Sequence, residues 1–175
     1  MSFDALISKL TDPSLIAIAR HWRDACGLHA MPGWQDIDPT AIAPYLPMVW
    51  AWRFDPAQNT FIGRLAGDRI VSMLGLHSRG KRLEECFAPE LVPLIMTRYR
   101  RVLDGPSFMR GEGPIYLRIG KQGLGERVVL PLAKDHVHAD GILGATIYKL
   151  QLPLNQTGGG ETDYSREELD FFPLG

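Results

Sequence analysis

The feature that most constrains this fold is a pair of alternating stretches joined by a turn, at residues 48–66. In MVWAWRFD the side chains alternate with the period of a β-strand, and the large apolar ones share one face: Met48, Trp50, Trp52 and Phe54. The segment DPAQN at 55–59 is rich in turn-forming residues, and residues 60–66 supply a second strand. Because so short a connection joins antiparallel strands, the sequence predicts a β-hairpin here.

Helical patterns lie on both sides of this hairpin. Residues 12–27 carry apolar side chains at helical spacing, with Asp12 placed to cap the start and Gly27 to end the helix. A short helix is predicted over 68–74 and a long one over 89–103, each with an apolar stripe. Such stripes must pack on an apolar surface elsewhere in the fold.

Beyond residue 106 the period of two returns, and three further strands are predicted within 107–120, 126–134 and 141–150. A hairpin, then helices, then three strands is typical of an α+β protein. We therefore predict a five-stranded antiparallel sheet with helices on one face and the N-terminal helix as a cap or dimer element.

The domain boundary is expected near residue 152. Residues 1–152 form a single domain in this interpretation, and residues 153–175 form a flexible tail that begins with a glycine-rich linker. Ser165 and Glu168 have the spacing of a capping box ahead of an apolar run. A short terminal helix or a docking peptide could therefore form here, and docking on its own domain and disorder stay open as alternatives.

Composition excludes several classes of partner. The chain has 175 residues with 19 basic and 20 acidic side chains, so a net charge of −1 gives no field to gather nucleic acid or anionic lipid. Cys26 and Cys86 are its two cysteines and form no C-x-x-C motif, which suits a reducing compartment. The N-terminus does not resemble a signal peptide, and no uncharged apolar run approaches the roughly 18 residues of a membrane span. We expect a soluble cytoplasmic protein.

No motif for catalysis, for a cofactor or for a metal is found. The stretch TFIGRLAGDRI at 60–70 resembles the start of a phosphate-binding loop, but it lacks the required lysine, and Gly63 and Gly67 have the wrong spacing. His136 and His138 form an H-x-H pair, which lies in a polar connection and is better explained as an exposed loop than as a metal site. The sequence therefore predicts no catalytic residue and no metal, and leaves a cofactor unknown.

Aromatic and aliphatic side chains are more abundant around the hairpin than a plain sheet needs. Such side chains facing short helices can line a pocket for a small molecule. The alternative is a core that these same side chains fill. The residues expected to line a pocket are Trp50, Trp52, Phe61, Arg64, Met73, Leu74, His77, Phe87 and Ile95.

Three motifs together resemble the PAS domain superfamily. They are DIDPTAIAPYLP at 36–47, FIGRLAG at 61–67 and GKRLEECF at 80–87. More narrowly, the chain is similar to small stand-alone bacterial PAS-like proteins, many without assigned function, over about residues 13–152. The resemblance implies a ligand or cofactor held between sheet and helices, whose occupancy is relayed to protein partners, often by dimers. That family has no established catalytic residues, so none are carried over, and no cysteine lies in the setting of flavin-adduct photosensors.

We therefore expect a sensory or regulatory module in signal transduction. It would bind a small ligand or a protein partner, act as a homodimer without nucleic acid or membrane, and not be an enzyme. One alternative is a small α+β enzyme in which Arg64, His77 or Arg118 contacts a substrate. The other is a purely structural protein-interaction domain with a filled core.

Overall fold

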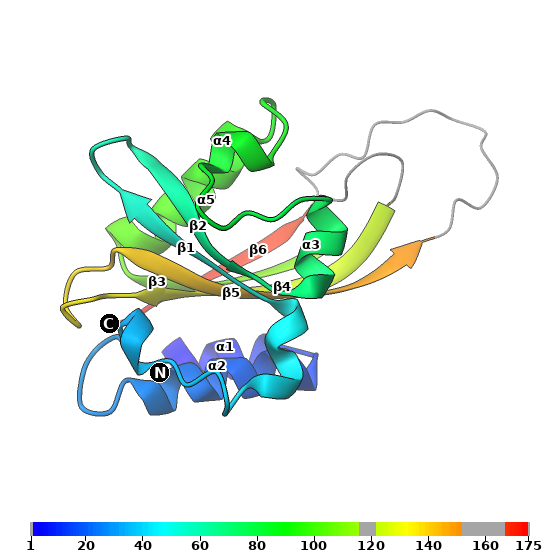
Figure 1. The fold of residues 1–175 in the computed structure, drawn as a ribbon. Helices are drawn as coiled ribbons and strands as arrows, with labels where there is room; N and C mark the ends of the chain where they lie inside the picture. The colour runs from blue at the N-terminus through cyan, green and yellow to red at the C-terminus, as the bar shows by residue number, and fades with distance from the viewer. Residues whose placement is uncertain (1, 116–121, 152–166, 175) are drawn as a thin grey trace.

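The computed structural model describes residues 2–115, 122–151 and 167–174. A six-stranded antiparallel sheet of order β2-β1-β5-β4-β3-β6 runs through the molecule, and helices lie on both of its faces (Figure 1). The elements are α1 (Ser2–Lys9), α2 (Pro13–Ala25), two 3-10 turns η1 (Trp34–Asp36) and η2 (Ala43–Met48), β1 (Val49–Asp55), β2 (Thr60–Ala66), α3 (Asp68–Leu74), α4 (Leu83–Cys86), α5 (Val92–Asp104), β3 (Ser107–Ile115), β4 (Gln122–Leu132), β5 (Gly141–Gln151) and β6 (Glu168–Pro173).

The two N-terminal helices cover one face of the sheet. Asp12 caps α2 as predicted, because its carboxylate accepts a hydrogen bond from the backbone N–H of Ser14 at 2.8 Å. On the same helix the buried Trp22 donates its indole N–H to the carbonyl of Pro131 at 2.7 Å. The core of this layer is formed mainly by α1 and α2 against β1, β4 and β5, and includes Leu15, Ile18, Trp22, Val49, Ala51, Val128, Leu130 and Leu143.

The opposite face is covered by α3, α4 and α5. The predicted alternation of β1 holds, since Trp50 and Trp52 face these helices whereas Val49 and Ala51 face the N-terminal pair. Two cores on two faces of one sheet place the aromatic side chains of the hairpin under α3 and α5, which positions the site described below. The remaining buried members of this core include Phe61, Ile70, Met73, Leu74, Leu83, Ile95, Tyr99, Val102, Met109, Val129 and Ile142.

Glycines allow the chain to cross tightly beneath α3. Gly75 ends that helix in the left-handed region, with a φ of 72°. The segment that follows lies against β2, where Gly63 donates its N–H to the carbonyl of Lys81 at 2.9 Å. A Cβ atom at Gly63 would lie 2.0 Å from the carbonyl oxygen of Ser78, so only glycine fits here.

The antiparallel α+β prediction is confirmed, with two differences in detail. The sheet has six strands rather than five, and helices cover both faces because α1 and α2 occupy the second one. In addition, residues 168–173 form the edge strand β6 instead of a terminal helix, and pair with β3 from Ser107↔Pro173 to Glu112↔Glu168. This pairing satisfies the outer backbone groups of β3, which a terminal helix would leave open.

Two expectations fall on parts of the chain that the structure does not describe. The glycine linker and Ser165 lie within 152–166, outside the described residues.

Among the helices that are described, none is long and apolar enough to cross a membrane.

Candidate functional site

A cavity lies between the sheet and helix α3. Its walls come from β1, α3, α5, β4, β5 and the segments that follow α3 and α4: Trp50, Trp52, Ile70, Met73, Leu74, Ser78, Phe87, Tyr99, Arg127 and Thr146. About 20 Å³ of it is open to the centre of a water molecule, and roughly 10–15 Å³ is enough for one water. The cavity is therefore small, with apolar walls and three polar side chains.

The position of Trp50 shapes this cavity. Its indole N–H donates a hydrogen bond to the hydroxyl of Thr146 on β5 at 2.9 Å, and both side chains are buried. Tyr99 from α5 stacks against the indole with ring centroids 5.5 Å apart. The indole is thus fixed at its polar edge and on one face, as buried tryptophans generally are.

A buried ionic cluster adjoins the cavity at Arg127 of β4. The carboxylate of Glu167, at the start of the β6 segment, accepts a hydrogen bond from Arg127 Nε at 2.5 Å and a second one from its Nη2. Arg98 of α5 binds the same carboxylate through Nη1 at 2.6 Å. The three side chains are 8% exposed or less. One carboxylate therefore joins helix α5, the central strand β4 and the edge strand β6.

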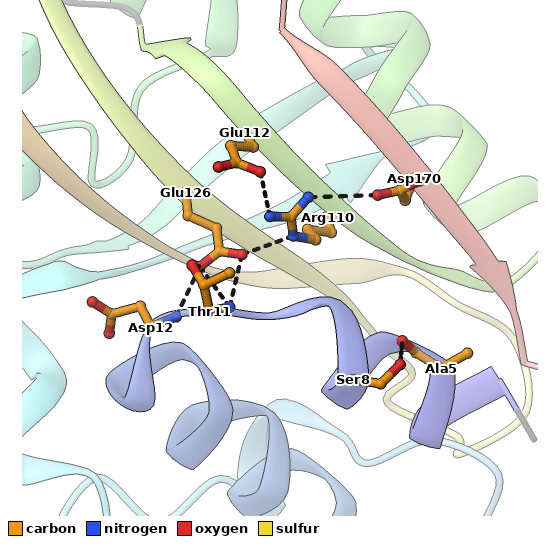
Figure 2. A network of polar contacts seen from close by, with 8 residues as sticks. All are labelled: Ala5, Ser8, Thr11, Asp12, Arg110, Glu112, Glu126 and Asp170. Atoms are coloured by element: carbon orange, nitrogen blue, oxygen red, sulfur yellow. Dashed lines mark hydrogen bonds and ion pairs between the residues drawn. The ribbon is translucent and has the colours of Figure 1, made fainter.

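A second buried cluster lies on the other face of the same strands (Figure 2). Glu126 of β4 accepts hydrogen bonds from the backbone N–H groups of Thr11 at 3.1 Å and Asp12 at 3.0 Å, just before α2. It also pairs with Nε of Arg110 on β3 at 2.7 Å. Arg110 in turn reaches Glu112 and, at 3.5 Å, Asp170 on β6. This cluster fastens the N-terminal helices to the sheet.

A comparison with known protein families identifies the family to which this fold belongs. The model of the PAS domain family matches residues 10–147. The chain belongs to the PAS domain family. The resemblance stated from the motifs is thereby confirmed at the level of the superfamily.

One solved structure that is similar to this PAS domain is described as VqmA bound to DPO. The two chains share 14% identity with a TM-score of 0.47, over 63% of this chain and 56% of that one. The match thus spans little more than half the length of that structure's chain. A comparison with curated proteins found no match.

Most of the predicted pocket residues belong to the core between the PAS sheet and helices α3 to α5, and some line its cavity. Those that line it are Trp50, Trp52, Met73, Leu74 and Phe87. Phe61 and Ile95 are buried in the same core without being part of the cavity wall that the structure describes.

Two predicted residues are placed elsewhere. Arg64 is exposed, and its guanidinium lies 4.8 Å from the ring centroid of Trp34, a residue packed against the core of the N-terminal helices. His77 is exposed in the segment after α3. Arg118, named as a substrate contact in the enzyme alternative, lies outside the described residues.

Sequence reasoning missed the polar wall of the cavity. Ser78, Arg127 and Thr146 were not predicted to line it, and neither was the pairing of Arg127 with Glu167. One signal was present, because Glu126 and Arg127 interrupt an otherwise apolar strand. Charged side chains on a strand buried on both faces need partners, but the sequence does not say which residues these are.

The H-x-H pair does not converge on one point. His136 contacts Asp36 through Nε2 at 2.8 Å and stacks on His29, whereas His138 contacts Asp135 through Nδ1 at 2.7 Å. The backbone N–H of Gly33 and the ring of His136 lower the pKa of Asp36 below its ordinary value. Within the described ranges, no group of three or more His, Cys, Asp or Glu side chains could hold a metal ion.

Proposed function

We propose that this PAS domain is a sensory module that binds a small ligand in the cavity between the sheet and α3 and acts on a protein partner in signal transduction. The observation that carries the proposal is the composition of the cavity wall. Apolar and aromatic side chains surround three polar ones, Ser78, Arg127 and Thr146. Sites for small molecules generally combine these two ingredients, the first for affinity and the second for orientation.

The strands that border the cavity offer a route from ligand to partner. Neighbouring residues of a strand point to opposite faces, so β4 presents Arg127 to the cavity and Glu126 to the N-terminal helices. A ligand that moves β4 would also alter the hold on Thr11 and Asp12. The ligand shifts the balance between two arrangements by no more than its difference in affinity for them.

The proposal extends to the setting of the protein. We place it in the cytoplasm of a bacterium, as a homodimer in which the N-terminal helices contribute to the contact, with neither nucleic acid nor membrane as partner. In favour of this are the net charge of −1 and the two free cysteines, both buried. It is proposed to act by binding and not as an enzyme.

A second candidate function is a protein-interaction domain that binds no small molecule. The observation in its favour is the size of the cavity, which has room for about one water. Under this alternative the aromatic side chains are simply the core. A ligand would in contrast require α3 or the ring of Trp50 to move.

The experiment that separates the two is ligand detection on the full chain. Native mass spectrometry of the purified protein reports a retained small molecule, and a thermal-shift screen of metabolites finds ligands that were lost on purification. A matched pair of variants on α3 locates the site: Leu74→Trp fills the cavity, whereas Ser72→Trp adds the same ring at an exposed position.

The sensory proposal requires a ligand that binds the wild type and Ser72→Trp and is lost in Leu74→Trp. A folded wild type that retains nothing and responds to no compound would instead support the protein-interaction domain. A ligand that binds all three proteins equally would place the site elsewhere and contradict the proposal.

A further inference from the structure

The carboxylate of Glu167 lies in a preformed carboxylate-binding site beside the cavity, which we call the seat. Arg127 on β4 binds both oxygens of this carboxylate, and Arg98 on α5 binds one of them. The backbone also leaves room for it, because a Cβ atom at Gly111 would lie 2.2 Å from Glu167 Oε1. Two arginines that are more than nine-tenths buried and a glycine thus surround one anionic group.

The carboxylate that fills this seat belongs to the residue just before β6. β6 is an edge strand paired on one side with β3. Its residues are half-buried or exposed, whereas the first four residues of β1 and of β2 are buried. Strands with little buried surface open at the lowest free energy. Glu167 therefore occupies its seat through a weakly held part of the sheet.

Arg127 belongs to both the seat and the cavity wall. We infer that the ligand of the cavity is a small monocarboxylate with an apolar body, and that its carboxylate replaces that of Glu167 on Arg127 and Arg98; this rests on the proposed function. The apolar body lies among the aromatic side chains, where α3 or the ring of Trp50 moves to make room for it. Arginine is suited to both partners because its planar guanidinium binds carboxylates through two parallel hydrogen bonds.

Ligand binding and release of β6 then become one event. When the ligand takes the seat, Glu167 is displaced and β6 loses its fastening on this face of the sheet. The same strand carries Asp170, which lies 3.5 Å from Arg110 on the opposite face. The start of the C-terminal strand is thus the element through which a carboxylate would be sensed.

The test uses benzoate and its neutral counterpart benzamide as probes of the full chain. Removing the competing group in Glu167→Ala should tighten benzoate binding by at least about tenfold, the ratio expected for a charge-assisted contact. Benzamide should bind the variant and the wild type alike. Glu168→Ala is the matched control, because that carboxylate is next in sequence but exposed. Calorimetry or tryptophan emission gives the affinities.

A second measurement needs no variant and stands if Glu167→Ala does not fold. Saturating benzoate should speed hydrogen exchange of the β6 amides in the wild type while leaving those of β1 unchanged, and benzamide should have no such effect. Arg127→Gln should remove the response to benzoate.

Three results would overturn the inference. The first is that Glu167→Ala and the wild type bind benzoate equally well. The second is that Glu167→Ala gains as much affinity for benzamide as for benzoate. The third is that benzoate leaves hydrogen exchange of the β6 amides unchanged. If neutral compounds still bind the cavity and are lost in Leu74→Trp, the sensory proposal stands and only the carboxylate inference falls. If no compound binds any of these proteins, both fall.

Discussion

Trp50 and Gly144 are directly opposite each other on β1 and β5, and the indole covers the glycine. A Cβ atom at Gly144 would lie 2.2 Å from Cζ2 of Trp50, closer than any side chain tolerates. The missing side chain therefore allows the indole to lie against the sheet and reach the hydroxyl of Thr146. The shape of the cavity depends on this pair.

Substitution Gly144→Ala tests the relationship. The added methyl group forces the indole away from the sheet and weakens its hydrogen bond to Thr146, so the free energy of unfolding should fall by about 1–3 kcal/mol, as for overpacking elsewhere. Gly105→Ala is the control, because a Cβ atom there meets nothing within 4 Å. Urea unfolding of both variants gives the values, and equal stability of Gly144→Ala and the wild type would contradict the packing described.

Substitution Glu126→Gln should loosen the N-terminal helices. Glu126 is 7% exposed and accepts from Arg110 and from the backbone of Thr11 and Asp12, so the neutral amide leaves a buried guanidinium and these N–H groups poorly paired. The expected loss in unfolding free energy is on the order of 3 kcal/mol.

The matched control for this loss is Glu112→Gln, which touches the same arginine from a side chain that is 53% exposed. Exposed pairs contribute roughly 0–1 kcal/mol, so this variant should be nearly as stable as the wild type. Hydrogen exchange adds a local readout, since the amides of Thr11 and Asp12 should lose protection in Glu126→Gln alone. Similar losses in both variants would show that burial of the pair is unimportant.

The local pattern was enough to predict the strands of the hairpin and the capped helix α2. Alternation in MVWAWRFD assigned Trp50 and Trp52 to one face and Val49 to the other, which is what the sheet shows. Such predictions succeed because they depend on the period of a single element.

The sequence does not predict which side chains and strands pair when their elements are far apart in the chain. Glu167 and Arg127 are separated by 40 residues, and no local pattern pairs them. Likewise the segment ELDFFP follows the capping-box spacing of Ser165 and Glu168, yet Phe171 packs against one core and Phe172 against the other. The open edge of β3 decides in favour of a strand, and that edge is a property of the assembled sheet.

The stability contributed by Asp36 should depend on pH in the acid range. The backbone N–H of Gly33 and the ring of His136 hold the pKa of Asp36 below its ordinary value of 3.8 in the folded protein. The unfolded state therefore binds the proton more readily, and the contribution of Asp36 is present above pH 3.8 and lost as the pH falls further. The stability difference between the wild type and Asp36→Asn should shrink as the pH falls below 3.8. A difference that grows over this acid range would reverse the sign and contradict these contacts.

The two cysteines should react slowly in the native protein. Burial raises the pKa of both thiols, Cys26 on the N-terminal side and Cys86 in α4, to about 11. At pH 8 only about one thiol in a thousand would then be the reactive thiolate, and neither sulfur is at the surface. Labelling with a chromogenic disulfide at pH 8 should therefore be slow for the native protein and fast in urea, with the rate limited by opening of the fold. Rapid labelling of either cysteine in buffer would show that its side of the sheet opens far more easily than this packing implies.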